Sequence, residues 1–127
     1  MADLTQEDLQ AISDLTCEQL QVKVRPHIHY RRLRSGGRAS YRTGYASVPR
    51  WAADWGEVYL VYYTLHEVAH HIHRETGWNW SKVHSSEYKA IEDKVLALWG
   101  LKIERMKAYP KHIYHNGQLA FTNPRHR

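Results

Sequence analysis

A periodic apolar segment in the middle of the chain constrains the fold more than any other feature. From Trp55 to about Glu75, apolar residues recur every three or four positions, at Val58, Val61, Leu65, Val68, Ala69 and Ile72. This period is that of one face of an α-helix. Asp54 precedes the segment, and Gly77 follows it at a position where helices commonly end. The pattern predicts a long helix over residues 55–75 with one face buried in a core.

The flanking segments predict two further helices. Residues 5–20 place Leu9, Ile12 and Leu15 on one helical face, with Thr5 as a candidate N-cap. Residues 84–99 predict another helix, capped by Ser81 or Ser85 and ended by Gly100.

The remaining segments predict two hairpins. Residues 22–48 read as two strands joined by a turn at 35–38, with the second strand over 39–48 and Gly44 as a bulge. Pro110 breaks the tail, and residues 112–121 read as a small hairpin around Asn116-Gly117. The 127 residues therefore predict one α+β domain, 1–127, in which a small antiparallel hairpin or sheet packs on the long helix and a second helix.

The long helix carries the motif His66-Glu67-Val68-Ala69-His70. Residues four apart on a helix lie one above the other, so both imidazoles can reach one ion. Glu67 lies beside them and can take a proton from an attacking water. This combination is typical of a catalytic zinc site, which needs three protein ligands and leaves a fourth position open.

The spacing alone leaves the third ligand open. His73 lies on the same face, but three ligands on one straight helix would span about 10 Å at about 1.5 Å per residue, too far for one ion. Glu87 and Glu92 in the next helix are candidates, as is His84 at its start.

The motif and the segment His84-Ser85-Ser86-Glu87-Tyr88-Lys89 together resemble the SprT-like and YgjP-like minimal zincin metallopeptidases, over roughly residues 22–98. In those families a downstream histidine supplies the third ligand. The resemblance implies one Zn²⁺ per chain held by His66, His70 and His84, with Glu67 as the general base. It also implies substrates that are DNA-bound or crosslinked proteins. The chain departs from the SprT-like pattern at Ser85, usually Gly, and at Tyr88, usually Phe.

The charge is distributed in blocks. Residues 19–53 hold eight Lys and Arg and no acid, within a chain of net charge +5. Such a block favours a polyanionic partner. A cluster at the predicted hairpin tip, consisting of Arg31, Arg32, Arg34 and Arg38, is the candidate for contacts with DNA phosphates, and a solvated turn is the alternative.

Tyrosines near the predicted site are candidates to stabilise an oxyanion, although packing is their simpler role: Tyr41, Tyr45 and Tyr88. Side chains of the tail hairpin are candidates to reach the site as an electrophile: His112, Tyr114 and His115.

Composition excludes other classes. Cys17 is the sole cysteine, which excludes an intrachain disulfide framework and a multi-cysteine zinc site. No apolar run approaches the about 20 residues of a membrane span, and the polar, acidic start is unlike a signal peptide. We therefore expect a cytoplasmic zinc metallopeptidase acting on protein or peptide substrates, with no membrane partner. The alternative is a non-proteolytic DNA- or protein-binding module that zinc only stabilises.

Overall fold

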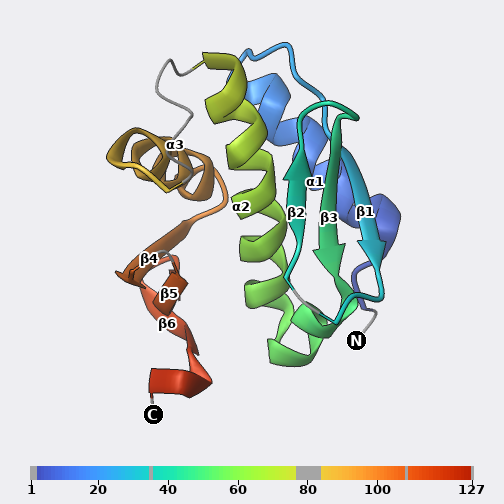
Figure 1. Cartoon of the computed structure of the whole chain (residues 1–127). Helices are drawn as coiled ribbons and strands as arrows, with labels where there is room; N and C mark the ends of the chain where they lie inside the picture. Colours follow the sequence, from blue (N-terminus) through green and yellow to red (C-terminus); the bar gives the residue numbers. More distant parts are fainter. Residues whose placement is uncertain (1–2, 35, 77–83, 108, 127) are drawn as a thin grey trace.

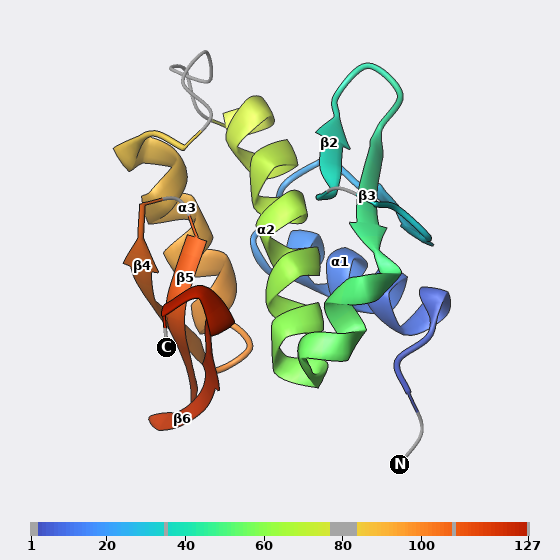
Figure 2. The same cartoon turned by 60° about the horizontal axis from the view of Figure 1, so that its bottom comes forward.

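The helix with the motif lies at the centre of the fold. The computed structural model describes residues 3–34, 36–76, 84–107 and 109–126. Its helices are α1 (Gln6–Gln19), α2 (Glu57–Thr76) and α3 (Ser86–Ala97), with 3-10 helices η1 (Arg50–Trp55) and η2 (Pro124–His126). Its strands are β1 (His27–Arg31), β2 (Arg38–Ser40), β3 (Tyr45–Pro49), β4 (Leu101–Met106), β5 (Tyr109–His115) and β6 (Gln118–Thr122). Figures 1 and 2 show α2 between a sheet of β1–β3 with α1 and a second unit of α3 and β4–β6.

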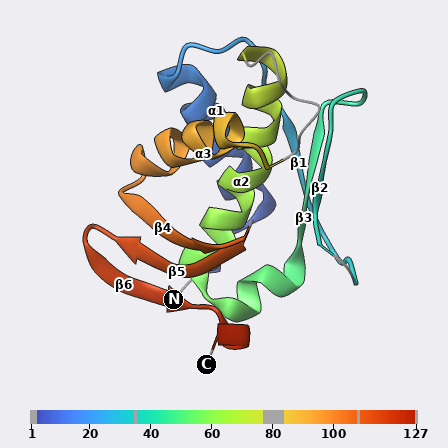
Figure 3. The same cartoon turned by 60° about the vertical axis from the view of Figure 1, so that its left-hand side comes forward.

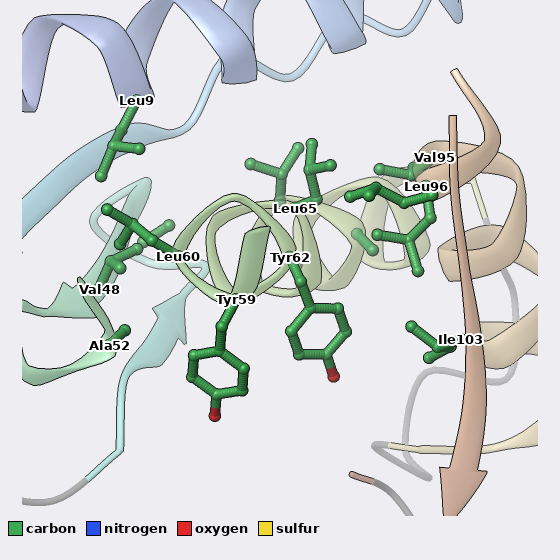
Figure 4. Close-up of a cluster of buried hydrophobic side chains, with 14 of the residues drawn as sticks. Leu9, Val48, Ala52, Tyr59, Leu60, Tyr62, Leu65, Val95, Leu96 and Ile103 are labelled. Carbon is green, nitrogen blue, oxygen red and sulfur yellow. The ribbon is translucent and has the colours of Figure 1, made fainter. Parts of the chain in front are cut away.

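The core forms around α2 because apolar side chains from every layer converge on it. Figure 4 shows Leu9 of α1, Val48 of β3, Leu96 of α3 and Ile103 of β4 around the buried face of α2, where Leu65 is fully buried. The predicted α+β class is confirmed. Among the helices that the structure describes, none has both the length and the apolar character that a membrane crossing requires.

The helix ends follow local chemistry. The Thr5 hydroxyl accepts a hydrogen bond from the Asp8 amide, and the Asp8 carboxylate accepts one from the Thr5 amide, so the predicted N-cap of α1 is confirmed. Residues 50–55 form a separate 3-10 turn, and Gly56, at φ 106°, separates it from α2. The helix predicted from residue 55 therefore begins at Glu57. Ser85 caps α3 through the Tyr88 amide, while the predicted roles of Gly77 and Ser81 lie outside the described residues.

The prediction of one hairpin over 22–48 is wrong in its pairing. β1 runs parallel to β3, and β2 pairs antiparallel with β3 on the other side, in the order β1-β3-β2. The tight turn joins β2 to β3 and ends at Gly44, at φ 76°, so Gly44 is a turn residue and not a bulge. Gly37 explains why the segment before β2 lies so close to its neighbours: a Cβ there would lie 2.0 Å from the Ser47 carbonyl oxygen.

Two glutamines of α1 cover the outer edge of the first sheet. Gln10 accepts a hydrogen bond from the Ile28 amide at 2.8 Å and donates to the Pro26 carbonyl at 2.9 Å. Gln6 accepts from the Tyr30 amide at 2.8 Å and donates to the Ile28 carbonyl. Side-chain amides thus take the place of a neighbouring strand along β1. The edge that remains is β2.

The C-terminal part is a three-stranded antiparallel sheet and not only the predicted hairpin over 112–121. The order is β4-β5-β6, and Figure 3 shows α3 above this sheet. β5 and β6 form the hairpin expected around Asn116 and Gly117, and β4 adds a strand on the other side of β5. Pro110 lies inside β5, where we expected a break.

Candidate metal centre

A cleft of about 530 Å³ lies against α2 and is bordered by segments from both halves of the chain. The segment leading into β2, the turn after it, η1, α2 and the C-terminal sheet with η2 contribute to it. Its lining residues are Gly36, Gly37, Arg38, Ala39, Tyr41, Trp51, Trp55, Tyr59, Tyr63, His66, Glu67, His70, His84, Met106, Tyr109, Asn123 and Arg125. The motif on α2 therefore opens into a cavity large enough for part of a polymer chain.

Three histidines meet at this cleft. His66 and His70 lie one turn apart on α2, and His84 immediately precedes the N-cap of α3. One ring nitrogen of each lies within 4.8 Å of the others. The ring centroids are 4.9 Å apart for His66 and His70, 5.2 Å for His66 and His84, and 4.9 Å for His70 and His84. We call these residues the three-histidine cluster.

The cluster has the nitrogen ligands that zinc binds, and one of its three pairs already has the matching spacing. Two nitrogens bound to one tetrahedral zinc at about 2.1 Å lie about 3.4 Å apart. The Nε2 atoms of His66 and His84 are 3.4 Å apart. Burial and the nearby His66 lower the pKa of His70 to about 3. The pKa of His84 is also lowered, mainly by burial and to a smaller extent by His66. Both imidazoles are therefore neutral near pH 7, the form that binds a metal.

Glu67 is a buried carboxylate at the edge of the cluster. Its side chain lines the cleft, although only 4% of the residue is exposed. Burial raises its pKa to about 7, an effect that His66 opposes and Glu92 increases. A carboxylate whose pKa lies near neutrality can both accept and return a proton.

The two glutamates considered as third ligands bind other groups. The Glu92 carboxylate accepts a hydrogen bond from Nδ1 of His66 at 2.5 Å. Burial alone would raise the pKa of Glu92, but His66, Arg105 and Tyr88 outweigh it and lower the pKa to about 2. The Glu87 carboxylate lies 2.7 Å from Nε2 of His73. Neither glutamate belongs to the cluster of ligand atoms that includes His84.

The other histidines of α2 are structural. His73 is 1% exposed, and its Nε2 lies 2.7 Å from the Glu87 carboxylate of α3. His71 is buried, and its Nε2 lies 3.0 Å from the Tyr45 carbonyl oxygen of β3. These contacts attach α2 to α3 on one side and to the first sheet on the other.

The three candidate tyrosines have different environments. Tyr41 lines the cleft from the turn after β2, packs edge-on against His71 at 5.3 Å, and lies beneath Arg74. Tyr45 packs against His29 at 3.9 Å and does not line the cleft. Tyr88 is buried, and its hydroxyl lies 2.8 Å from the His66 carbonyl oxygen and 2.9 Å from a Glu92 carboxylate oxygen, so its single proton can be donated to either acceptor. Only Tyr41 is therefore placed to meet a substrate in the cleft.

The candidate arginines lie on the surface before and at β2. Arg31, Arg32, Arg34 and Arg38 are all exposed, and Arg38 also lines the cleft. The tail residues His112, Tyr114 and His115 do not line the cleft. His112 lies 3.1 Å from the Thr122 hydroxyl. The C-terminal side chains at the cleft are instead Met106, Tyr109, Asn123 and Arg125.

Sequence reasoning missed the aromatic wall of the cleft, which consists of Trp51, Trp55, Tyr59 and Tyr63. The rings of Trp55 and Tyr59 lie 4.8 Å apart, and Trp51 lies 5.8 Å from Tyr63, which in turn lies 6.3 Å from His66. Periodicity could have placed Tyr59, Tyr63 and His66 on one side of α2. No local signal joins them to η1 or to the C-terminal sheet.

Comparison with known proteins supports the fold. No protein-family model matches the chain, and no match was found among curated proteins. Among solved structures, the chain is similar to the crystal structure of the metallopeptidase zymogen of Pyrococcus abyssi abylysin, with a TM-score of 0.53 and 21% sequence identity over 69% of this chain and 79% of that chain. The chain thus shares its α+β fold with that metallopeptidase zymogen, and His66, His70 and His84 form a group that could hold a metal ion at the cleft.

Proposed function

We propose that this chain is a zinc-dependent metallopeptidase that hydrolyses peptide bonds in protein substrates. The observation that carries the proposal is the three-histidine cluster with the buried Glu67 beside it, both facing one cleft. Three protein nitrogens leave one coordination position free, as catalytic zinc sites do. A site that only stabilised the fold would not need a carboxylate with a pKa of about 7 at this position.

The roles of the residues follow from their positions. Zinc held by His66, His70 and His84 would supply a Lewis acid that polarises the scissile carbonyl and acidifies a water. Glu67 accepts a proton from the attacking water and delivers it to the leaving amine as the peptide bond breaks. Its raised pKa favours the first transfer, because a less basic carboxylate would take the proton from water poorly. Tyr41, which lines the cleft from the turn after β2, is the candidate to donate a hydrogen bond to the developing oxyanion.

The substrate binds as an extended strand along β2. The segment from Gly36 to Ala39 lines the cleft, and the other edge of its sheet is covered by Gln6 and Gln10. A peptide can therefore extend this sheet only at β2. The aromatic wall of Trp51, Trp55, Tyr59 and Tyr63 then faces the side chains next to the scissile bond, so we expect faster cleavage beside bulky apolar residues than beside glycine.

We further propose that the substrates are DNA-associated proteins. Arg31, Arg32 and Arg34 are exposed, and Arg38 connects this basic surface to the cleft. A polyanion held there would keep a bound protein close to β2. The resemblance of the motif region to SprT-like proteins supports the same class of substrate.

The test is a cleavage assay on a DNA-bound protein and on a free unfolded protein, with and without DNA and a chelator. We expect zinc-dependent cleavage of both, faster for the bound protein when DNA is present. Glu67→Gln should keep zinc and the fold but lose cleavage. A wild-type chain that binds zinc without cleaving either substrate would instead support the alternative, a zinc-stabilised binding module. Cleavage that is indifferent to DNA would remove only the DNA-related part.

A further inference from the structure

A buried carboxylate lies directly behind the three-histidine cluster. Glu92 on α3 is 1% exposed and does not line the cleft, so a substrate in the cleft does not meet it. Its Oε2 lies 2.5 Å from Nδ1 of His66 and accepts a hydrogen bond from the Tyr88 hydroxyl at 2.9 Å. Its Oε1 accepts a hydrogen bond from Arg105 at 2.8 Å. Both carboxylate oxygens are therefore engaged.

The two nitrogens of the His66 ring face different partners. Nδ1 points to Glu92, and Nε2 points to His84, 3.4 Å away. A carboxylate can only accept a hydrogen bond, so the contact with Glu92 requires a proton on Nδ1, and in the neutral ring the lone pair then lies on Nε2. The carboxylate thus selects the tautomer that a metal at the cluster needs.

Arg105 connects this arrangement to the C-terminal sheet. It lies on β4, where the register with β5 shifts between Glu104 and Arg105. Such a bulge redirects a side chain. The Arg105 guanidinium reaches Glu92 and also contacts Asp93 at 2.8 Å. A buried carboxylate without a cationic partner would be costly, so Arg105 keeps Glu92 ionised and in place.

We propose that Glu92 and Arg105 are positioning residues that set the metal affinity of His66. This inference rests on the proposed metal site. Glu92 holds the ring orientation and increases the basicity of the ligating nitrogen, while Arg105 makes the metal affinity depend on the folding of β4. Removal of such a partner of a metal-binding histidine typically weakens metal affinity about 10–100-fold.

The experiment measures the zinc dissociation constant by competition with a chelator of known affinity. The chains compared are the wild type, Glu92→Gln, Arg105→Met and the control Asp93→Asn. The control removes a contact of the same guanidinium, but Asp93 is 59% exposed and does not touch His66. We expect zinc binding at least about tenfold weaker for Glu92→Gln and Arg105→Met, and unchanged binding for Asp93→Asn.

A second measurement separates positioning from general stability. The imidazole nitrogen chemical shifts of His66 in the zinc-free protein should show the proton on Nδ1 in the wild type and a mixture of tautomers in Glu92→Gln. Denaturation of the zinc-free chains reports their folding, and Arg105→Lys, which keeps the charge, replaces Arg105→Met if that variant unfolds.

Wild-type zinc affinity in folded Glu92→Gln would overturn the proposal, as would equal losses in Arg105→Met and Asp93→Asn. A wild-type chain that binds no zinc would refute the metal site itself, a result distinct from equal affinity across the variants.

Discussion

Replacement of Glu67 by glutamine should stabilise the metal-free protein at high pH while abolishing its activity. Glu67 is 4% exposed, and burial raises its pKa from 4.5 to about 7. The folded chain therefore holds this proton more tightly than the unfolded chain. As the pH rises from about 4.5 to about 7, the contribution of Glu67 to the free energy of unfolding falls. A shift of this size corresponds to about 3 kcal/mol, at about 1.4 kcal/mol per pH unit.

Glutamine does not titrate, so Glu67→Gln avoids this loss. The assay is urea denaturation of both chains with a chelator present, at several values between about pH 4.5 and pH 8. The variant should gain about 3 kcal/mol relative to the wild type across this range. Titrating groups that do not interact with Glu67 are common to both chains and cancel in the difference, whereas its electrostatic partners His66 and Glu92 contribute to the measured change. The zinc-loaded variant should cleave at least about a hundredfold more slowly.

The control is Glu18→Gln on α1, which replaces an exposed carboxylate by the same amide away from the cleft. If the difference for Glu67→Gln were flat with pH, or grew toward acid, Glu67 would not be desolvated and its role as a buried base would fail.

Three further predictions concern the ligand, the basic surface and the thiol. His84→Ala should reduce bound zinc well below one ion per chain by metal analysis, because the cluster loses its one ligand from outside α2; undiminished zinc content would show that another residue completes the site. Replacement of Arg31, Arg32 and Arg34 by serine should weaken DNA binding and leave the zinc content unchanged. The slope of log affinity against log salt concentration should become shallower by about one unit per lost phosphate contact, and identical binding curves would contradict the DNA contact. Burial raises the pKa of Cys17 to about 11, so a thiol-specific reagent should label the folded protein far more slowly than the urea-unfolded chain, and equal rates would show that the thiol is accessible.

Local patterns were sufficient to predict the central helix and the meeting of its histidines. The 3.6-residue period around Leu65 marks the buried face of α2, and spacing alone brings His66 and His70 together. The placement of His84 needed the resemblance, because spacing left Glu87 and Glu92 as alternatives. Packing of α3 against α2 favours His84, since it gives each glutamate a histidine or arginine partner.

Strand pairing could not be predicted in the same way because it depends on contacts distant in sequence. The glycines at 36 and 37 resemble a hairpin turn, yet Gly37 is required for close approach to β3 and α2. The tight turn instead ends at Gly44. One signal was available but unused: Leu101, Ile103 and Arg105 alternate with polar residues, which predicts a strand. An arginine on the apolar face of that strand indicates a buried acidic partner, which proved to be Glu92.

The amides of Gln6 and Gln10 on β1 also limit how this protein can associate with itself. A sheet with two open edges can add one molecule at each and grow without limit, which is the geometry of fibrils. In the first sheet, side chains of α1 already take the hydrogen bonds of β1, and β2 alone stays open. Two molecules could join through their β2 edges, but that pairing uses the open edge of each, so growth through this sheet stops at a dimer. A competing peptide on β2 would prevent even that step.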